Sequence, residues 1–117
     1  GDCCMRLQQV KEILDARVFY GEDRLGEEVH SAFASDFMSD VLAFVKSQDL
    51  LLTGMINSQV VRTAEMMDMR CIVFVRGKTP TEDIVEMARE RGIVLLATQR
   101  RMYPSCGMLY AAGLAGG

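Results

Sequence analysis

Histidine and closely spaced cysteines are scarce in this sequence. His30 is the only histidine, and no two of the four cysteines form a Cys-x-x-Cys pair. Structural zinc sites combine about four cysteine and histidine ligands at such short spacings, so we predict no metal site and no cofactor. Cys71 opens an apolar run and is expected to behave as a small buried hydrophobe. Unpaired thiols and the lack of an export signal fit a reducing compartment, the cytoplasm.

The motifs of common catalytic sites are missing as well. Neither the phosphate-binding loop G-x-x-x-x-G-K-[ST] nor the dinucleotide-binding G-x-G-x-x-G is present. Ser105 and Cys106 suggest a nucleophile, but no second histidine is available to activate either side chain. Their context also differs from the strand–turn–helix of a nucleophile elbow. We therefore predict no catalytic residues and no enzymatic activity.

Basic charge and long apolar runs are lacking too. The net charge is −3 and the pI is about 5.1, so a nucleic-acid-binding surface is not expected. The apolar run that ends at Arg76 is too short to span a membrane. Cys3-Cys4-Met5 is followed at once by Arg6 and a polar segment, which is unlike a signal peptide. We expect neither nucleic acid nor a membrane as a partner.

The chain does contain enough apolar residues for one core. Half of its 117 residues are apolar, and this length suits a single domain. No repeat, linker or low-complexity segment divides the sequence. We predict one domain at residues 6–114 and expect residues 1–5 and 115–117 to fray.

The spacing of apolar residues alternates between the periods of helices and strands. Strands are expected at residues 17–21, 29–35, 49–53, 71–75 and 93–98, and helices at 6–14, 37–47, 59–68, 80–91 and 104–114. The last three strands are separated by helices, which requires right-handed crossovers and parallel pairing. We predict an α/β fold with three layers, α/β/α, around a mixed, largely parallel sheet. The first two strands are expected to pair antiparallel at one edge.

The fourth helix has the clearest end signals. Thr79 is the expected N-cap, Pro80 occupies the first helical position, and Glu82 completes a capping box. Gly92 is expected to end the helix in a left-handed conformation.

The other helices are predicted from polar caps and apolar faces. The second helix is capped by Ser35 or Asp36, and the third by Asn57 or Ser58. The side chains expected to face the core are Leu7, Val10, Leu14, Met38, Val41, Leu42, Val45, Val60, Ala64, Met67, Cys106, Leu109 and Tyr110.

The carboxyl ends of the strands form the predicted binding site, because ligands of open α/β sheets bind beyond these ends. The candidate ligand-binding residues at this edge are Asp36, Thr53, Gly54, Asn57, Arg76, Gly77, Lys78 and Thr98.

Two interpretations of Thr53-Gly54 remain open. The pair forms either a tight strand-to-helix turn, with Gly54 at a positive φ, or a point where a ligand approaches the backbone closely. In the second case the N-terminus of the helix after Asn57 would favour an anion.

The cations Arg76 and Lys78 also have two interpretations. They belong either to a solvated loop or to a clamp for phosphate or carboxylate groups, with Gly77 between them. Arg62 is expected to form a surface ion pair with Glu65 instead of contacting a ligand.

Three stretches of the sequence resemble a known family. "ASDFMSDVLAF", "DLLLTGMINSQVVRTAEMMD" and "IVFVRGKTPTEDIVEMARERGIVLLATQ" are similar to the DRTGG domain, and the similarity extends over residues 6 to 114. The resemblance implies a fold like the N-terminal domain of HPr kinase/phosphorylase, in a stand-alone form without the kinase domain. The family's Asp-Arg pair aligns with Asp49-Leu50, and its Thr-Gly-Gly with Arg76-Gly77-Lys78. Asp49 therefore joins the candidate ligand-binding residues.

Two functions follow from these expectations. Members of the family resemble regulatory modules, found beside CBS domains in pyrophosphatases, and related domains tend to be dimeric. The resemblance, together with the cationic strand ends, predicts a non-catalytic sensor that binds a small anionic metabolite or nucleotide. The alternative is a protein-interaction module, a homodimer or a complex with another protein, in which the pocket is vestigial. The loss of Arg and Thr from the family motif favours this alternative.

Overall fold

The computed structural model describes residues 4–116 and contains a mixed α/β fold. The helices are α1 (Leu7–Leu14), α2 (Met38–Phe44), α3 (Ser58–Met66), α4 (Glu82–Arg91) and α5 (Met102–Ala111), with a 3-10 helix η1 (Glu22–Arg24). The strands are β1 (Met5–Arg6), β2 (Arg17–Tyr20), β3 (Glu28–Val29), β4 (Ala32–Ala34), β5 (Leu50–Thr53), β6 (Cys71–Phe74) and β7 (Val94–Ala97). No helix within residues 4–116 is long and apolar enough to cross a membrane.

The main sheet has five strands in the order β2-β7-β6-β5-β4. The four strands from β4 to β7 are parallel, and β2 pairs antiparallel with β7. The predicted antiparallel pairing of the first two strands is therefore wrong, because β2 and β4 lie at opposite edges. The chain crosses from one edge to the other through η1 and β3, which pairs with β1 in a separate two-stranded ladder.

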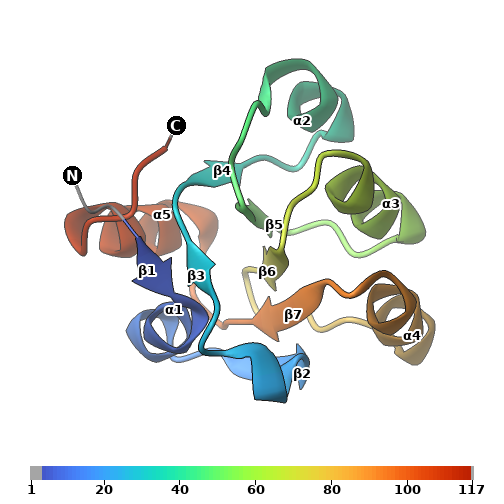
Figure 1. The fold of residues 1–117 in the computed structure, drawn as a ribbon, viewed down its shortest axis with the longest axis horizontal. Helices are drawn as coiled ribbons and strands as arrows, with labels where there is room; N and C mark the ends of the chain where they lie inside the picture. The colour runs from blue at the N-terminus through green and yellow to red at the C-terminus, as the bar shows by residue number, and fades with distance from the viewer. Residues whose placement is uncertain (1–3, 117) are drawn as a thin grey trace.

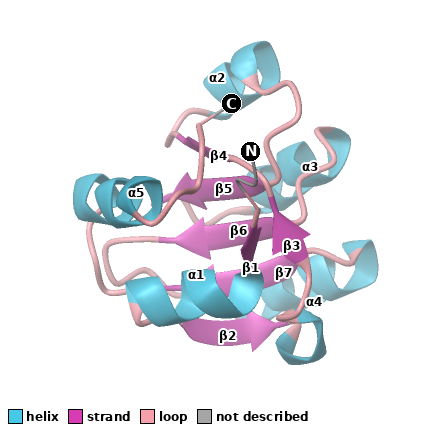
Figure 2. Ribbon diagram, turned by 60° about the vertical axis from the view of Figure 1, so that its left-hand side comes forward, coloured by secondary structure: helices cyan, strands magenta, loops and turns pink. Residues whose placement is uncertain are grey.

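Helices cover both faces of this sheet, so the three-layer prediction is confirmed (Figures 1 and 2). On one face α1 and α5 pack with the β1–β3 ladder, and on the other lie α2, α3 and α4. Successive side chains of a strand point to opposite faces, so Leu50 and Leu52 join the α1–α5 core while Leu51 joins the other. Burial raises the pKa of the Cys71 thiol, as expected for a small core residue.

Most predicted helix faces and ends match the structure. Leu7, Val10 and Leu14 are fully buried, and the carboxamide of Asn57 accepts a hydrogen bond from the Val60 amide of α3 at 3.0 Å. Gly92 ends α4 with φ at 69°. The spacing of residues therefore predicted the buried face of α1, the cap of α3 and the end of α4 correctly.

Other predicted ends are wrong. α4 begins two residues later than expected, because Thr81 and not Thr79 is its N-cap. Neither Ser35 nor Asp36 caps α2, whose N-cap is Phe37. The Ser35 hydroxyl instead accepts a hydrogen bond from the Phe37 amide at 3.0 Å, and Asp36 turns toward the end of β5.

Two apolar side chains predicted to face the core are exposed, Leu42 on α2 and Tyr110 on α5. Both helices therefore carry apolar surface outward.

Both ends of the described part of the chain contact the rest of the domain. Met5 is buried in β1 and pairs with Val29. Near the carboxyl end, the Ala32 amide donates to the carbonyl oxygen of Ala115 at 2.9 Å, and Gln48 donates to that of Gly116 at 3.2 Å. Met5, Ala115 and Gly116 make these contacts in the segments for which fraying was predicted, while residues 1–3 and 117 lie outside the described part.

Candidate functional site

A groove of about 590 Å³ lies at the carboxyl ends of β5 and β6. The loop between β5 and α3 forms one wall, and the loop between β6 and α4 forms the other. The groove is lined by Gly54, Met55, Ile56, Arg76, Gly77, Lys78, Thr79 and Thr81. Four of these residues, Gly54, Arg76, Gly77 and Lys78, were candidates from the sequence. The structure therefore places these four candidates around one groove.

The loop after β6 is a tight turn with an unusual arginine. The Lys78 amide donates to the Val75 carbonyl at 3.3 Å, and both central residues have positive φ, 64° at Arg76 and 73° at Gly77. This is the backbone of a type I′ turn. A residue with a side chain costs roughly 1–2 kcal/mol in this conformation. Strain of this kind is concentrated at functional sites, which draws attention to Arg76.

Backbone hydrogen bonds from the end of β7 hold this turn in place. The Arg76 amide donates to the Arg100 carbonyl at 2.7 Å, and the Gly77 amide donates to the Thr98 carbonyl at 3.0 Å. These two bonds join the loop after β6 to the loop after β7. The Arg76 guanidinium is therefore presented from a fixed backbone.

Asp36 connects the two walls of the groove. Its Oδ1 accepts hydrogen bonds from the Gly54 amide at 2.7 Å and from the Thr53 hydroxyl at 3.3 Å. Its Oδ2 lies 3.7 Å from a guanidinium nitrogen of Arg76. Asp36 thus holds the β5 turn and orients Arg76. The contacts of this carboxylate in the structure are therefore with Thr53, Gly54 and Arg76.

Gly54 is required here for space and not for its φ. The glycines with positive φ in the described chain are Gly21, Gly77, Gly92 and Gly113, so the predicted positive φ at Gly54 is wrong. A Cβ at position 54 would lie 2.6 Å from Nε of Arg76 and closer still to one of its terminal nitrogens. Close approach of a ligand to this backbone was one of the two interpretations of the sequence, and the structure places the Arg76 side chain there.

Thr53 and Thr98 point into the protein. Thr53 is fully buried, and its hydroxyl also accepts a hydrogen bond from the Met55 amide at 3.2 Å. The buried Thr98 hydroxyl donates to the Leu14 carbonyl at 2.6 Å, at the end of α1, and accepts from the Arg100 amide at 3.2 Å. Both hydroxyls fix the loops that form the rim.

Asp49 lies at the opposite end of the sheet. It precedes the first residue of β5, whereas Thr53 is the last, so about 13 Å of strand separates the two. The Asp49 carboxylate accepts a hydrogen bond from the His30 amide at 2.9 Å and lies 3.5 Å from the His30 ring nitrogen. The structure therefore does not bring Asp49 to the groove.

The sequence missed several lining residues. Thr79 was assigned to a helix cap, yet Thr79 and Thr81 both line the groove, and their position beside Arg76 and Lys78 is the signal that was available. The Thr81 hydroxyl contacts the Asp83 carboxylate, and this hydrogen bond lowers the pKa of Asp83. Met55 and Ile56 add an apolar part that no motif marked.

Charges around the groove are mixed, and the two cations face it from one loop. The Arg76 side chain is 45% exposed beside a partly exposed Asp36, and Lys78 is exposed. The predicted pair of Arg62 with Glu65 is wrong, because Glu65 pairs with Arg91 at 3.0 Å. Within residues 4–116 no cluster of three histidine, cysteine or acidic side chains could hold a metal ion.

The fold and the groove define a small three-layer α/β domain, and comparison with known proteins identifies its family. The profile of the DRTGG domain matches residues 9–112. The chain therefore belongs to the DRTGG domain family. No curated protein sequence matches it significantly.

One solved structure with this fold contains the CBS and DRTGG domains of the regulatory region of Clostridium perfringens pyrophosphatase, complexed with its activator diadenosine tetraphosphate. The TM-score is 0.71 and the sequence identity is 16%. The match covers 89% of this chain and 45% of that chain, so this chain spans less than half the length of that structure. The likeness shows that the fold is shared.

Proposed function

We propose that this DRTGG domain, residues 6–114, is a non-catalytic regulatory module that binds a small anionic metabolite or nucleotide in the groove between Gly54 and Thr81. The observation that carries the proposal is Arg76, an arginine in a strained backbone conformation, fixed by the end of β7 and oriented by Asp36. Glycine would adopt this conformation without the cost of roughly 1–2 kcal/mol that a side chain adds.

The lining of the groove suits an anion attached to a less polar group. Arg76 and Lys78 offer hydrogen bonds assisted by positive charge, which favour phosphate and carboxylate oxygens. Thr79 and Thr81 add hydroxyls, while Met55 and Ile56 provide apolar surface. A phosphorylated sugar or a nucleotide combines these features.

The family supports a regulatory role. The similar structure comes from the regulatory region of a pyrophosphatase and contains a nucleotide activator. The histidine His30 and the thiols of Cys71 and Cys106 do not line the groove. His30 pairs with Asp49 at the other end of β5, and burial raises the pKa of the Cys106 thiol on α5. The free thiols of Cys71 and Cys106 agree with the cytoplasm as the expected compartment.

Thermal unfolding with a set of anions tests this proposal. A ligand at about 100 times its Kd stabilises the folded state by roughly 2.7 kcal/mol, a shift of several degrees for a domain of this size. The probes are inorganic phosphate, AMP, ATP, glucose 6-phosphate and citrate. We expect Arg76→Gly and Lys78→Ala to abolish the shift that the best probe causes.

Matched variants make the result decisive. Arg76→Gly removes the guanidinium but suits the positive φ, so the turn should survive. Arg62→Ala removes an exposed cation from α3, outside the groove, and should leave the shift unchanged. No shift with any probe, or an equal shift in Arg76→Gly and Lys78→Ala, would refute binding in this groove.

A second candidate function is protein interaction, as a homodimer or with another protein. The observation that favours it is the exposed apolar surface of α2 and α5, where Leu42 and Tyr110 face solvent. Exposed apolar patches of this kind commonly mark interaction sites.

A further inference from the structure

A second, smaller cavity adjoins the groove at the loop after β6. Its volume is about 50 Å³, and it is lined by Asp15, Arg17, Gly77, Lys78, Thr79, Ala97, Thr98 and Gln99. Three of these residues, Gly77, Lys78 and Thr79, also line the groove. The two cavities therefore share the loop after β6 as a wall. We call the smaller one the β7 cavity, because the last residue of β7 lines it.

Arg17 brings a cation to the β7 cavity from the start of β2. β2 is antiparallel to β7, and Arg17 pairs with Ala97, the last residue of β7. The start of β2 therefore lies at the same rim as the carboxyl ends of the parallel strands. The Arg17 guanidinium lies 5.0 Å from the ring centre of Phe19, a cation–π contact. Residues two apart on a strand share a face, and Phe19 packs on the face that α2, α3 and α4 cover, so Arg17 lies on the side of the sheet where the loop after β6 enters α4.

The charges that line the β7 cavity favour an anion. Arg17 and Lys78 are exposed cations, and Asp15 is the one carboxylate among the lining residues. Within residues 4–116 neither cation forms an ion pair. Both positive charges are therefore available to a ligand, and the Asp15 carboxylate opposes them only in part.

Gly77 allows the Gln99 side chain to lie close to the turn. A Cβ at position 77 would lie 2.8 Å from the carboxamide oxygen of Gln99. Glycine is therefore needed here for space as well as for its φ of 73°. The carboxamide of Gln99 has two N–H donors, which add to the two cations around a phosphate group.

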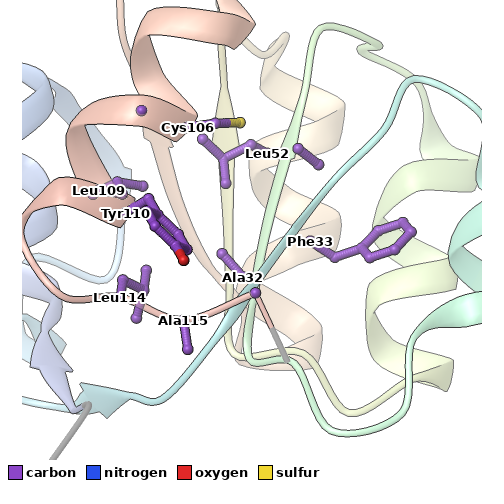
Figure 3. A pocket seen from close by; sticks show the side chains of 11 residues that line it. Ala32, Phe33, Leu52, Cys106, Leu109, Tyr110, Leu114 and Ala115 are labelled. Carbon is purple, nitrogen blue, oxygen red and sulfur yellow. The ribbon is translucent and has the colours of Figure 1, made fainter.

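An apolar pocket of about 310 Å³ elsewhere in the molecule does not suit an anion (Figure 3). Figure 3 shows Cys106, Leu109 and Tyr110 of α5 near Leu52 and Ala32. No charged side chain is among the residues that line this pocket. An anionic group of a ligand that extends from the groove is therefore expected in the β7 cavity, although the apolar pocket is larger.

We propose that the β7 cavity is a subsite for a second phosphate group of the ligand that the groove binds. This subsite rests on the proposed function, because it extends the site at Arg76. Neighbouring strands lie about 4.8 Å apart, and one to two strand spacings separate the two cavities, so the phosphate groups would lie roughly 5–10 Å apart. The ligand class is then a small molecule with two phosphate groups several bonds apart, such as a sugar bisphosphate or a nucleoside triphosphate. A monophosphate occupies only one of the two subsites.

Isothermal titration calorimetry of the whole chain with matched probes tests the second subsite. Glucose 6-phosphate is compared with glucose 1,6-bisphosphate, and AMP with ATP. A second group on the same molecule binds at a high effective concentration, so we expect the Kd to fall at least about tenfold from the monophosphate to its partner in one of the pairs. The pair with the larger fall distinguishes a sugar ligand from a nucleotide.

Two substitutions in the β7 cavity should change this gain in opposite directions. Arg17→Gln should remove most of the gain and leave the Kd of the monophosphate within about twofold of wild type. Asp15→Asn should increase the gain by about two- to fivefold, because it removes an opposing charge. Asp15 has a positive φ of 50°, which asparagine also adopts. Asp15→Asn therefore still tests the cavity if Arg17→Gln fails to fold.

Lys46→Gln is the matched control, because Lys46 is an exposed cation in the loop before β5, at the other end of the sheet. It removes the same charge and should leave the gain unchanged. Monophosphate binding without any gain would overturn the second subsite and leave the proposed function intact. The subsite would also be refuted by an equal loss of the gain in Arg17→Gln and Lys46→Gln, or by a smaller gain in Asp15→Asn. No binding of any of the four probes would refute the proposed function and the subsite together.

Discussion

At the scale of single residues, the space over Gly54 determines where the Arg76 guanidinium lies. The glycine has no side chain, so the guanidinium of Arg76 lies against its backbone and within 3.7 Å of Asp36. The sequence indicated that positions 54 and 76 matter, since both lie at strand ends. It could not show that they matter to each other, because 22 residues separate them and only the parallel pairing of β5 with β6 brings them together.

Gly54→Ala is predicted to separate binding from stability. The added Cβ would lie 2.7 Å from Cζ of Arg76, at the far end of a flexible side chain that can move away. The backbone at Gly54 has no positive φ, so alanine fits it. We expect the free energy of unfolding in urea to change by less than about 1 kcal/mol. The anion-induced thermal shift should fall as far as it does in Arg76→Gly.

A Gly54→Ala variant that binds like the wild type would show that the position of the Arg76 guanidinium is unimportant for the site. The Gly107→Ala variant is a suitable control, because a Cβ there meets no neighbouring atom and the residue lies on α5, outside the groove. It should bind like the wild type.

At the scale of elements, the sequence correctly predicted the helix faces and helix ends that depend on residues close together in the chain. The α1 face, the Asn57 cap and the end of α4 at Gly92 each follow from spacing within a few residues, and each is confirmed. The start of α4 was predicted two residues too early, because the Thr-Pro pair at 79–80 resembles a cap and a first helical position while the N-cap is Thr81. The edge position of β2 depends on where the chain returns after α1, which local patterns do not encode.

The dependence on neighbouring residues also explains which candidate site residues were placed correctly from the sequence and which were not. Gly54, Arg76, Gly77 and Lys78 were correctly expected at one rim, because parallel strands end on the same side. Asp49 came from a motif alignment, and its place before β5 puts it at the opposite end. The inward roles of Thr53 and Thr98 depend on Asp36 and on the Leu14 carbonyl, which are distant in sequence.

One further prediction concerns pH and follows from the ion pair between Arg24 and Glu27. Arg24 of η1 contacts Glu27 through two nitrogens, at 2.7 and 3.0 Å, and also contacts the Gly92 carbonyl at the end of α4. The hydrogen bond from Arg24 lowers the pKa of Glu27, with Arg70 at 3.6 Å adding to the effect. This pair therefore stabilises the fold only while Glu27 is charged.

Glu27→Gln should flatten the dependence of stability on pH. A lowered pKa in the folded state contributes stability above the unfolded value of about 4.3, and this contribution is lost as pH falls through the folded pKa. Glu27 is about one-third exposed, so we expect at most about 1 kcal/mol. Urea unfolding between about pH 6 and 3 measures the difference from wild type.

Glu86→Gln is the control, because Glu86 and Arg89 form an exposed pair on α4 that should contribute little. If Glu27→Gln and the wild type lose the same free energy on acidification, the Arg24–Glu27 pair does not stabilise the fold.

At the scale of the whole molecule, the fold separates two surfaces. The groove lies at the carboxyl ends of β5 and β6. Exposed apolar side chains and an apolar pocket lie on the side of the sheet that ends in β4, and Figure 2 shows β4 with α2 and α5 near it. Three layers make this possible, because helices bury both faces of the central strands and leave the strand ends and one edge for other contacts. A ligand in the groove and a partner at the edge can therefore be present together.

The central claim is that an anion binds beside Arg76, and amide chemical shifts test it most directly. Protein labelled with nitrogen-15 is titrated with the most stabilising probe from the thermal series, or with inorganic phosphate. We expect saturable changes at the amides of Gly54–Ile56 and Arg76–Thr79, and no changes at His30 and Asp49. Saturable changes confined to other residues, or none at all, would contradict the account.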